Sequence, residues 1–249
     1  MGMDKPALGY IGLGLMGGPM TERLLDAECP VTVWNRNREK IVTALEKGAK
    51  EGASPADVTR NSDIVQTCVT DGAAMEEIVF GPGGIAESAS ADKVLIDYST
   101  IPPDAARDMA ARLKDKTGMR WIDAPVTGGV VGAQAGALVI FAGGDEADIE
   151  AVRPSVMHMA RSFTRMGPQG AGLVTKLCNQ TINACVKVVL SEMLSLARDG
   201  GIDGAVLPQV MKGGSADSSQ LQREAPRMVA RDFDNPHGTV YTIYKDLGI

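Results

Sequence analysis

The segment Tyr10-Ile11-Gly12-Leu13-Gly14-Leu15-Met16-Gly17-Gly18-Pro19-Met20 decides the fold of this chain. A short apolar run at residues 7–11 leads into it and predicts a buried strand, and apolar residues at helical spacing follow it. The pattern Gly-x-Gly-x-x-Gly therefore lies at a strand-to-helix turn, which is the context that a dinucleotide site requires. The alternative is a glycine-rich turn that binds nothing, but the flanking strand and helix favour binding.

Each glycine of this motif has its own physical role. Gly12 permits the tight turn, Gly14 lets the backbone approach a pyrophosphate, and Gly17 lets the helix pack closely on the strand. The N–H groups of the first helical turn then face the phosphates, and the helix dipole adds to the attraction. The predicted phosphate-binding residues are those of the whole turn: Gly12, Leu13, Gly14, Leu15, Met16 and Gly17.

The second expected strand, Val31–Trp34, ends in Asn35 and Arg36, with no carboxylate at its tip. In a dinucleotide domain this tip meets the adenosine ribose, where an acidic residue accepts a hydrogen bond from the 2′-hydroxyl and an arginine pairs with a 2′-phosphate. A guanidinium holds a phosphate through two parallel hydrogen bonds. The tip therefore predicts NADP as the preferred cofactor and NAD as the second choice. The alternative is that Arg36 and Arg38 are solvated loop charges.

Strands and helices alternate along the chain as far as residue 167. Further strands are expected at residues 64–69 and 94–97, from residue 121, and at 138–142 and 161–166. Helices are expected at residues 39–47, from residue 54 with Ser54 as N-cap, and at 74–80, 103–116 and 145–159. This alternation predicts an α/β fold for residues 1–167: a doubly wound, mostly parallel sheet of the Rossmann type, covered by helices on both faces.

Side chains at the carboxyl edge of this sheet are candidates for ligand contact, because ligands bind there in open α/β folds. Val69 and Thr70 follow one expected strand, and Thr100 follows the next. The Thr100 hydroxyl can cap the following helix or touch a cofactor, and capping is the favoured role.

A proline and two glycines follow the strand that begins at residue 121. Pro125, Gly128 and Gly129 fit a turn that exposes successive backbone N–H groups, which is a concavity suited to an anion. A plain glycine turn explains this piece equally well when it is considered alone.

Residues 171–198 contain no proline, and apolar residues occupy most faces of the helix that they predict. At 1.5 Å per residue this helix is roughly 40 Å long. A helix that is apolar all round is buried, so we expect it to run between domains or between subunits. Shorter helices are expected at residues 202–211, at 221–231 with an interruption at Pro226, and from residue 244, with a loop at 232–236. Residues 168–249 are therefore predicted to form an all-α domain led by the long helix.

Three polar residues, Lys176, Asn179 and Gln180, lie in the first turns of this helix. Lys176 and Asn179 are three residues apart, so they share a face. A lysine among apolar residues loses hydration free energy unless another group compensates. From these residues alone, a chemical role for Lys176 and a side chain that reaches out to water are equally good explanations.

Composition argues against several classes of function. The formal net charge of −6 and the lack of a long basic run disfavour a nucleic-acid surface. No apolar run is long enough to span a membrane, and the first strand begins too early for a signal peptide. The four cysteines show no CxxC spacing, so we expect buried thiols in a reducing, cytoplasmic compartment. With only His158 and His237 available, no metal site is expected.

Four motifs occur in order, and together they resemble the β-hydroxyacid dehydrogenase family over essentially the whole chain. The first is the glycine turn, and the second is Asp123 to Gly129, with threonine at position 127 where serine is usual. The third is Gly170-Ala171-Gly172 followed by Lys176 and Asn179, and the fourth is Lys245-Asp246-Leu247. The resemblance implies an enzyme that transfers a hydride between a nicotinamide cofactor and a short hydroxy acid or its semialdehyde or keto acid. It also implies a homodimer or homotetramer, and a natural chain that continues beyond residue 249.

The resemblance implies roles for the residues at matching positions. Lys176 is the expected catalytic acid and base, and the amides of the turn at Thr127 are expected to hold the substrate carboxylate. The expected substrate-binding residues are Thr127, Gly128, Gly129, Asn179 and Gln180. The expected cofactor contacts outside the glycine turn are Asn35, Arg36, Val69, Thr70, Thr100 and Lys245.

Some positions depart from the family pattern. Gln180 stands where many members have asparagine, which is similar to the semialdehyde-reductase branch, and Thr70 and Ala74 replace a common proline and asparagine. Three other interpretations stay open: a non-catalytic dinucleotide-binding module, an imine reductase, which shares the architecture but usually lacks the lysine, and a partner-binding protein that oligomerises through the long helix.

Overall fold

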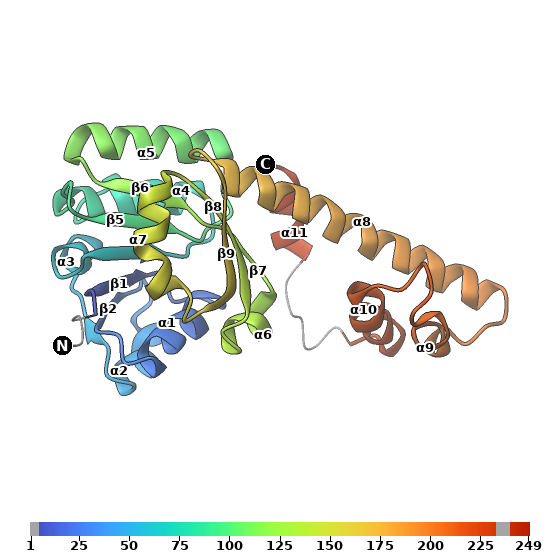
Figure 1. The fold of residues 1–249 in the computed structure, drawn as a ribbon. Helices are drawn as coiled ribbons and strands as arrows, with labels where there is room; N and C mark the ends of the chain where they lie inside the picture. Colours follow the sequence, from blue (N-terminus) through green and yellow to red (C-terminus); the bar gives the residue numbers. More distant parts are fainter. Residues whose placement is uncertain (1–4, 233–239) are drawn as a thin grey trace. The chain divides into compact units, whose positions relative to one another are not determined.

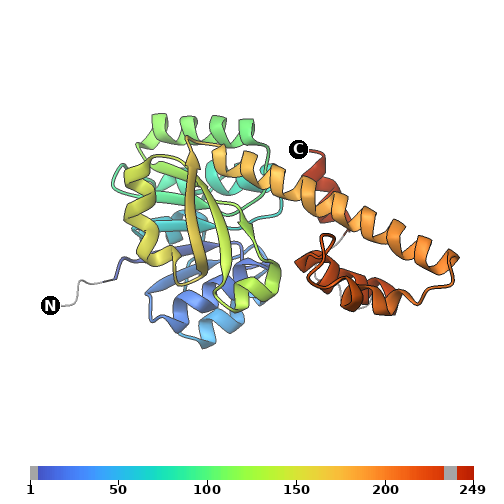
Figure 2. The same ribbon diagram turned by 45° about the vertical axis from the view of Figure 1, so that its right-hand side comes forward.

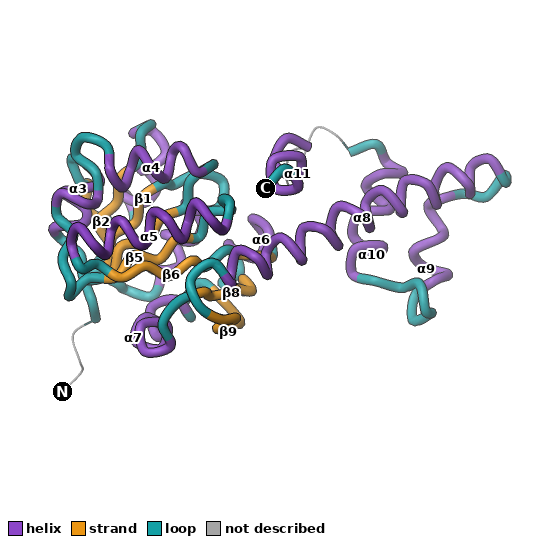
Figure 3. Tube along the Cα trace, turned by 90° about the horizontal axis from the view of Figure 1, so that it is seen from above, coloured by secondary structure: helices purple, strands orange, loops and turns teal. Residues whose placement is uncertain are grey.

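The computed structural model describes residues 5–232 and 240–249 (Figure 1). The chain forms two compact units, of which the first ends at Lys176 and also includes Ile249, while the second comprises Leu177–Gly248. Strands are confined to the first unit, and the described residues of the second unit are helices and loops (Figure 3). The two units are described one at a time.

The first unit is built on one nine-stranded sheet. Its strand order is β3-β2-β1-β4-β5-β6-β8-β7, and β9 also pairs with β8. The strands are β1 (Leu8–Ile11), β2 (Val31–Trp34), β3 (Lys50–Glu51), β4 (Ile64–Thr67), β5 (Val94–Asp97), β6 (Arg120–Asp123), β7 (Val126–Thr127), β8 (Leu138–Gly143) and β9 (Ala160–Gly167). All pairs from β3 to β6 are parallel, and β8 runs antiparallel to β6 and β7. The expected mostly parallel sheet is confirmed.

Helices cover both faces of this sheet (Figures 1 and 2). The α-helices of the first unit are α1 (Gly17–Asp26), α2 (Val42–Glu46), α3 (Pro55–Arg60), α4 (Gly72–Phe80), α5 (Pro103–Thr117), α6 (Gly129–Gln134) and α7 (Glu146–Val156). The short 3-10 helices are η1 (Arg38–Ile41) and η2 (Ile85–Glu87). As expected, Ser54 caps α3, because its hydroxyl accepts a hydrogen bond from the Asp57 N–H.

Side chains that alternate along the strands separate the core into two layers. Tyr10 and Ile96 belong to a cluster with Met20 and Leu24 of α1. Ile11 belongs to a second cluster, which includes residues of α4 and α5. Each face of the sheet is therefore buried under its own set of helices, as the doubly wound pattern requires.

The long helix α8 (Ala171–Asp199) contributes residues to both compact units, because the division falls after Lys176. The second unit adds the 3-10 helix η3 (Gly204–Val206) and the helices α9 (Leu207–Met211), α10 (Ser219–Ala230) and α11 (Val240–Leu247). Its small core contains Leu190 of α8 packed with Leu221 and Ala225 of α10. No helix in the described part of the chain is long and apolar enough to cross a membrane.

Several local expectations are wrong. Helix α10 continues through Pro226, because the Ser218 hydroxyl caps its first turn and its face at Leu221 and Ala225 is buried. The helix expected at 202–211 begins only with η3 at Gly204, where the Asp203 side chain accepts from the Ala205 N–H. The loop expected at 232–236 lies largely outside the described residues.

Other differences concern where helices begin and which short elements occur. Thr100 is not the N-cap residue of α5, since α5 begins at Pro103 and Pro102 occupies the N-cap position. The expected helix at 39–47 is divided into η1 and α2. The two-residue strands β3 and β7, and the glycine-led helix α6, were not expected because such short pieces carry no period.

The apolar faces of α8 are largely exposed within the single chain, so the expected burial between domains or between subunits stays a prediction. Ile182 and Leu196 are 65% and 75% exposed, and Val188 and Val189 are exposed as well. Cys178 and Cys185 on the same helix are exposed too, whereas Cys29 is buried and Cys68 half-buried. Apolar composition shows that a helix face is suited to burial but does not show what covers it.

The packing at the start of α8 makes a direct prediction. A Cβ at Gly172 would collide with the Phe141 carbonyl oxygen and would lie 2.8 Å from the Asp123 carbonyl oxygen. Because both obstacles are backbone atoms, we expect Gly172→Ala to lower the free energy of unfolding by about 1–3 kcal/mol in urea titrations. Gly18→Ala in the first turn of α1 is the control, since no heavy atom lies within 4 Å of its Cβ. Equal stability of the two variants would contradict the described packing.

Candidate functional site

The glycine turn has the geometry that its motif predicts. Gly12 has φ +95°, and a Cβ there would collide with the Cys68 carbonyl oxygen. A Cβ at Gly17 would collide with the Gly12 carbonyl oxygen and lie 3.1 Å from the Tyr10 ring. A Cβ at Gly14 would meet nothing within 4 Å. Packing therefore requires glycine at the first and third positions, and the second position leaves the open space that a pyrophosphate needs.

Hydrogen bonds fix the rest of this turn. The Leu13 N–H donates to Asn35 Oδ1 at 3.0 Å, and Asn35 Nδ2 donates to the Asn37 carbonyl at 2.8 Å. Helix α1 begins after Met16 without a capping side chain. In its first turn the Gly18 N–H donates to the Gly14 carbonyl at 3.0 Å, and Pro19 has no N–H group. Asn35 thus ties the tip of β2 to the glycine turn, in addition to its predicted place beside the ribose.

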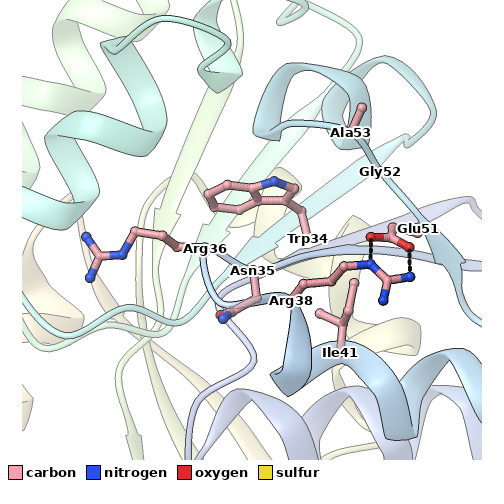
Figure 4. Close-up of a pocket in the computed structure, with 8 residues that line it drawn as sticks. All are labelled: Trp34, Asn35, Arg36, Arg38, Ile41, Glu51, Gly52 and Ala53. Carbon is pink, nitrogen blue, oxygen red and sulfur yellow. Dashed lines mark hydrogen bonds and ion pairs between the residues drawn. The ribbon is translucent and has the colours of Figure 1, made fainter.

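A cavity of about 560 Å³ lies at the tip of β2, within the size range of small-ligand sites (Figure 4). Its lining residues are Trp34, Asn35, Arg36, Arg38, Ile41, Glu51, Gly52 and Ala53. Arg36 points away from Arg38 and Glu51 in this view. Among residues 5–232 and 240–249, Arg36 forms no hydrogen bond or ion pair, so its guanidinium is free to bind an anion.

Arg38 behaves differently from Arg36. Its Nε and Nη2 atoms donate to the two carboxylate oxygens of Glu51 at 2.8 and 2.7 Å, and this pairing raises the pKa of Arg38. Arg38 is exposed, as the alternative interpretation expected, but Glu51 engages its guanidinium, so it is less available than Arg36 to bind an anion. The sequence placed no carboxylate at this tip, and the structure corrects that expectation, since the unexpected strand β3 carries Glu51 there. No local pattern marks Glu51, because strand pairing brings it to the site.

A buried polar network supports the neighbouring strand ends. Asp97 Oδ1 accepts hydrogen bonds from Thr67 Oγ1 at 3.0 Å and from the Ser99 N–H at 2.9 Å. Ser99 Oγ in turn accepts from the Val69 N–H at 2.9 Å. Burial raises the pKa of Asp97 to about 7, although the hydrogen bonds from Ser99 and Thr67 act in the opposite direction. The network fixes the segments that carry the predicted cofactor contacts Val69, Thr70 and Thr100.

The start of α8 rests on a second buried carboxylate. Asp123, at the end of β6, accepts hydrogen bonds from the Gly170 N–H at 2.6 Å and the Leu173 N–H at 2.9 Å. Burial raises the pKa of Asp123 to about 6, and the bonds from Gly170 and Leu173 oppose the shift. Lys176 follows one turn later and is itself buried, with 8% of its surface exposed. The Lys176 side chain therefore does not extend into solvent, contrary to the alternative interpretation.

The predicted carboxylate-binding turn lies between β7 and α6. Gly128 and Gly129 have φ +127° and +64°, a region that favours glycine, and α6 begins at Gly129 without a capping side chain. Both glycines are exposed, and Thr127 is half-buried. The backbone of this turn is therefore accessible to a ligand. Its position is fixed by the antiparallel pairing of Thr127 with Val139 of β8.

The remaining predicted residues belong to the second unit. Gln180 Nε2 donates to Asp246 Oδ2 at 2.7 Å, and Lys245 Nζ lies 3.0 Å from Asp246 Oδ1. Asn179 Nδ2 donates to Gln180 Oε1 at 3.0 Å. The buried Asp246 thus holds two of the predicted residues in place. The Lys-Asp-Leu motif contained this aspartate, but only its lysine was assigned a role from the sequence.

No group of three or more His, Cys, Asp and Glu residues suited to a metal ion occurs within the residues that the structure describes. The polar groups collected at the carboxyl edge of the sheet are instead amides, hydroxyls, two buried carboxylates and the Lys176 amine. Amide N–H groups and an amine can bind anionic groups, and an amine can donate or accept a proton.

Comparison with known sequences identifies the family. Residues 7–167 match the family described as the NAD binding domain of 6-phosphogluconate dehydrogenase. Residues 170–249 match the one described as NAD-binding of NADP-dependent 3-hydroxyisobutyrate dehydrogenase. The chain belongs to the β-hydroxyacid dehydrogenase family. This membership confirms the resemblance drawn from the four motifs.

Individual relatives and a solved structure are consistent with this family membership. The chain is 35% identical over 244 residues to 2-hydroxy-3-oxopropionate reductase of Escherichia coli, covering 97% of this chain and 82% of that one. It is 34% identical over 219 residues to 3-hydroxyisobutyrate dehydrogenase of Pseudomonas aeruginosa, covering 88% and 73%. The solved structure of Mycobacterium tuberculosis 3-hydroxyisobutyrate dehydrogenase with L-serine has a TM-score of 0.88 at 28% identity, covering 98% and 84%. This β-hydroxyacid dehydrogenase family member is an oxidoreductase with a nicotinamide-dinucleotide-binding domain.

The raised pKa of Asp97 predicts a pH dependence of stability. The folded state binds more protons than the unfolded state between the ordinary aspartate pKa and about 7, so the free energy of unfolding falls as pH rises through that window. We expect Asp97→Asn to remove this loss. Its stability relative to the unsubstituted chain should rise by a few kcal/mol from about pH 4 to about pH 8, at about 1.4 kcal/mol per pKa unit.

Urea titrations at the two pH values measure this difference. Asp115→Asn, at an exposed position of α5, is the control and should show no such rise. A stability difference for Asp97→Asn that is the same at both pH values would contradict the buried, proton-binding Asp97.

Proposed function

We propose that this chain is an NADP-dependent β-hydroxyacid dehydrogenase that transfers a hydride between the nicotinamide and a short hydroxy acid or its semialdehyde or keto acid. The observation that carries the proposal is the buried Lys176 amine, 8% exposed, on the first turns of α8. Burying an amine costs hydration free energy, and a protein that only binds a dinucleotide has no chemical use for one. The family membership supports the reaction class.

The residues present fit a nicotinamide dinucleotide. The open space at Gly14, next to the positive end of the α1 dipole, suits the pyrophosphate, and the cavity at the tip of β2 suits the adenosine end. When bound, this group supplies or accepts the hydride, while the protein provides orientation and electrostatics. The other predicted cofactor contacts are Val69, Thr70, Thr100 and Lys245.

Lys176 acts on the oxygen atom of the substrate. During reduction that oxygen gains negative charge, and the ammonium group stabilises the charge and donates a proton. During oxidation the neutral amine accepts the hydroxyl proton. The exposed amides of Gly128 and Gly129, with Thr127, hold the substrate carboxylate, and Asn179 and Gln180 bind the substrate near the amine. Fixing both ends of a short acid in this way accounts for a large share of the rate enhancement in such reactions.

The preference for NADP rests on Arg36. Arg36 is one of the residues that line the cavity, it is exposed, and its guanidinium forms no ion pair among the residues that the structure describes. Such a group is available for the two parallel hydrogen bonds that a 2′-phosphate accepts. Glu51 is already engaged by Arg38, so its negative charge is compensated rather than directed at the phosphate.

The proposal includes a homodimer or homotetramer in the cytoplasm. Exposed apolar residues on α8, such as Ile182 and Leu196, support self-association, because large apolar side chains exposed together mark an interface. None of the four cysteines, all of which lie in the described part of the chain, forms a disulfide, and this supports a reducing compartment. Light scattering and cell fractionation test these two points.

Two other functions are separated by one assay. Protein and NADPH are mixed with a panel of carboxylate-bearing semialdehydes and, separately, with a cyclic imine, and NADPH absorbance is followed. Turnover of semialdehydes supports the proposal, and turnover of only the imine favours an imine reductase. Cofactor binding without turnover of any compound favours a non-catalytic module.

Lys176→Ala is expected to lower kcat by about 10²–10⁴-fold, because the developing charge loses its proton donor. The dissociation constant for NADPH, measured by fluorescence titration, should change by less than about threefold, since the phosphate sites are untouched. Lys187→Ala, on the same helix, is the control and should keep ordinary turnover. Ordinary turnover in Lys176→Ala would reject the assigned role.

Arg36→Ala is expected to weaken NADPH binding by roughly 10–100-fold, since a charge-assisted pair contributes about 1.5–3 kcal/mol. NADH binding should change by less than about threefold, because NADH has no 2′-phosphate. Calorimetry with both cofactors measures the two effects, and Arg161→Ala on β9 serves as a control for the loss of one exposed positive charge. An equal loss for both cofactors would count against the NADP preference.

A further inference from the structure

The start of α8 poses a hydrogen-bonding problem. The first N–H groups of any α-helix lack partners within the helix and must be satisfied by other groups. At this helix the N–H of Gly170, which precedes the first helical residue, and that of Leu173, the third helical residue, both donate to Asp123. These are the two positions that a local capping box would satisfy, but here one carboxylate from the sheet serves both.

The carboxylate is held in a space that only glycine can provide. A Cβ at Gly143 of β8 would lie 2.7 Å from Asp123 Oδ2 and would collide with Oδ1. A Cβ at Gly172 would lie 2.9 Å from Oδ2. Any side chain at either position would displace the carboxylate or the helix start. This explains the second glycine of the Gly170-Ala171-Gly172 motif: it makes room for an acceptor from the sheet.

Charge makes this contact stronger than a neutral cap. Hydrogen bonds to an ionised acceptor are about twice as strong as those between neutral groups, and the dipole of the 29-residue helix favours an anion at its N-terminus. Asp123 is 0% exposed, so no water competes for its oxygens at the helix start. A loss of either bond would leave a buried N–H group without a partner, at about 1–3 kcal/mol.

We infer that Asp123 is a positioning residue for the reaction, which fixes the start of α8 and through it the Lys176 amine. Lys176 lies three residues after Leu173, whose N–H donates to Asp123. It is therefore on the same helical face as Leu173 and within one turn of it. A shift of about 1 Å at a reacting group lowers rates by roughly 10²-fold. This inference rests on the proposed function, because it assigns Asp123 an effect on the chemistry of Lys176.

The test is Asp123→Asn, which keeps the shape but replaces one acceptor oxygen with an NH₂ group that faces a donor. We expect kcat to fall by roughly 10–100-fold while the dissociation constant for NADPH changes by less than about threefold. Hydrogen exchange at residues 170–176 should become faster in this variant. Should it not fold, Asp123→Ser, a smaller side chain that keeps one acceptor, replaces it.

The control is Asp148→Asn, which removes another buried carboxylate from the first unit, the one paired with Arg120 at 2.7 Å. It should lower stability without lowering kcat, so a loss of kcat shared by both variants would overturn the positioning role. An unchanged kcat in Asp123→Asn would also overturn it.

The wild-type chain gives an independent readout. Amide exchange at Gly170 and Leu173 should be slow, and rapid exchange at both would refute the clamp whether or not any variant folds. If the unsubstituted protein turns over no substrate, the proposed function fails, while this exchange measurement still tests the contact. The two failures are therefore distinguishable.

Discussion

Within the first unit, one buried carboxylate connects the edge of the sheet, where the cofactor is proposed to bind, to the start of the helix that carries Lys176. Asp123 ends strand β6 at the edge of the sheet where the glycine turn also lies, and it accepts the two N–H groups at the start of α8. The helix that carries Lys176 therefore begins at a place set by the sheet. Because both bonds are buried and charge-assisted, displacing the helix start would leave polar groups unsatisfied.

The loops proposed to bind the cofactor are also held by hydrogen bonds between side chains and backbone. Asn35 fastens the glycine turn to the tip of β2, and the chain Asp97–Ser99–Val69 fastens the ends of β4 and β5. Each link fixes a loop to the strand beneath it, so the loops are ordered before a ligand arrives. Preorganised contacts of this kind reduce the entropy that binding must overcome.

Much of the fold follows from local rules that the sequence displays. The turn from Gly12 to Gly17 was predictable because its glycine spacing between a strand and a helix is a local sequence pattern, although the backbone that excludes a side chain at Gly12 belongs to the distant Cys68. Contacts between distant parts of the chain were not: Asp123 meets α8 across 47 and 50 residues, and Glu51 reaches the β2 tip through a two-residue strand. The exposed face of α8 and the unbroken helix at Pro226 show the same limit, because packing rather than local preference decides both.

The most direct measurement of the central claim is steady-state oxidation of NADPH by the unsubstituted protein with matched pairs of aldehydes, one member bearing a carboxylate and the other lacking it. A buried amine that protonates the substrate oxygen, together with amides that hold a carboxylate, predicts turnover that saturates with the carboxylate-bearing member and is much slower with its partner. Tight NADPH binding without turnover of any aldehyde or keto acid would contradict the account.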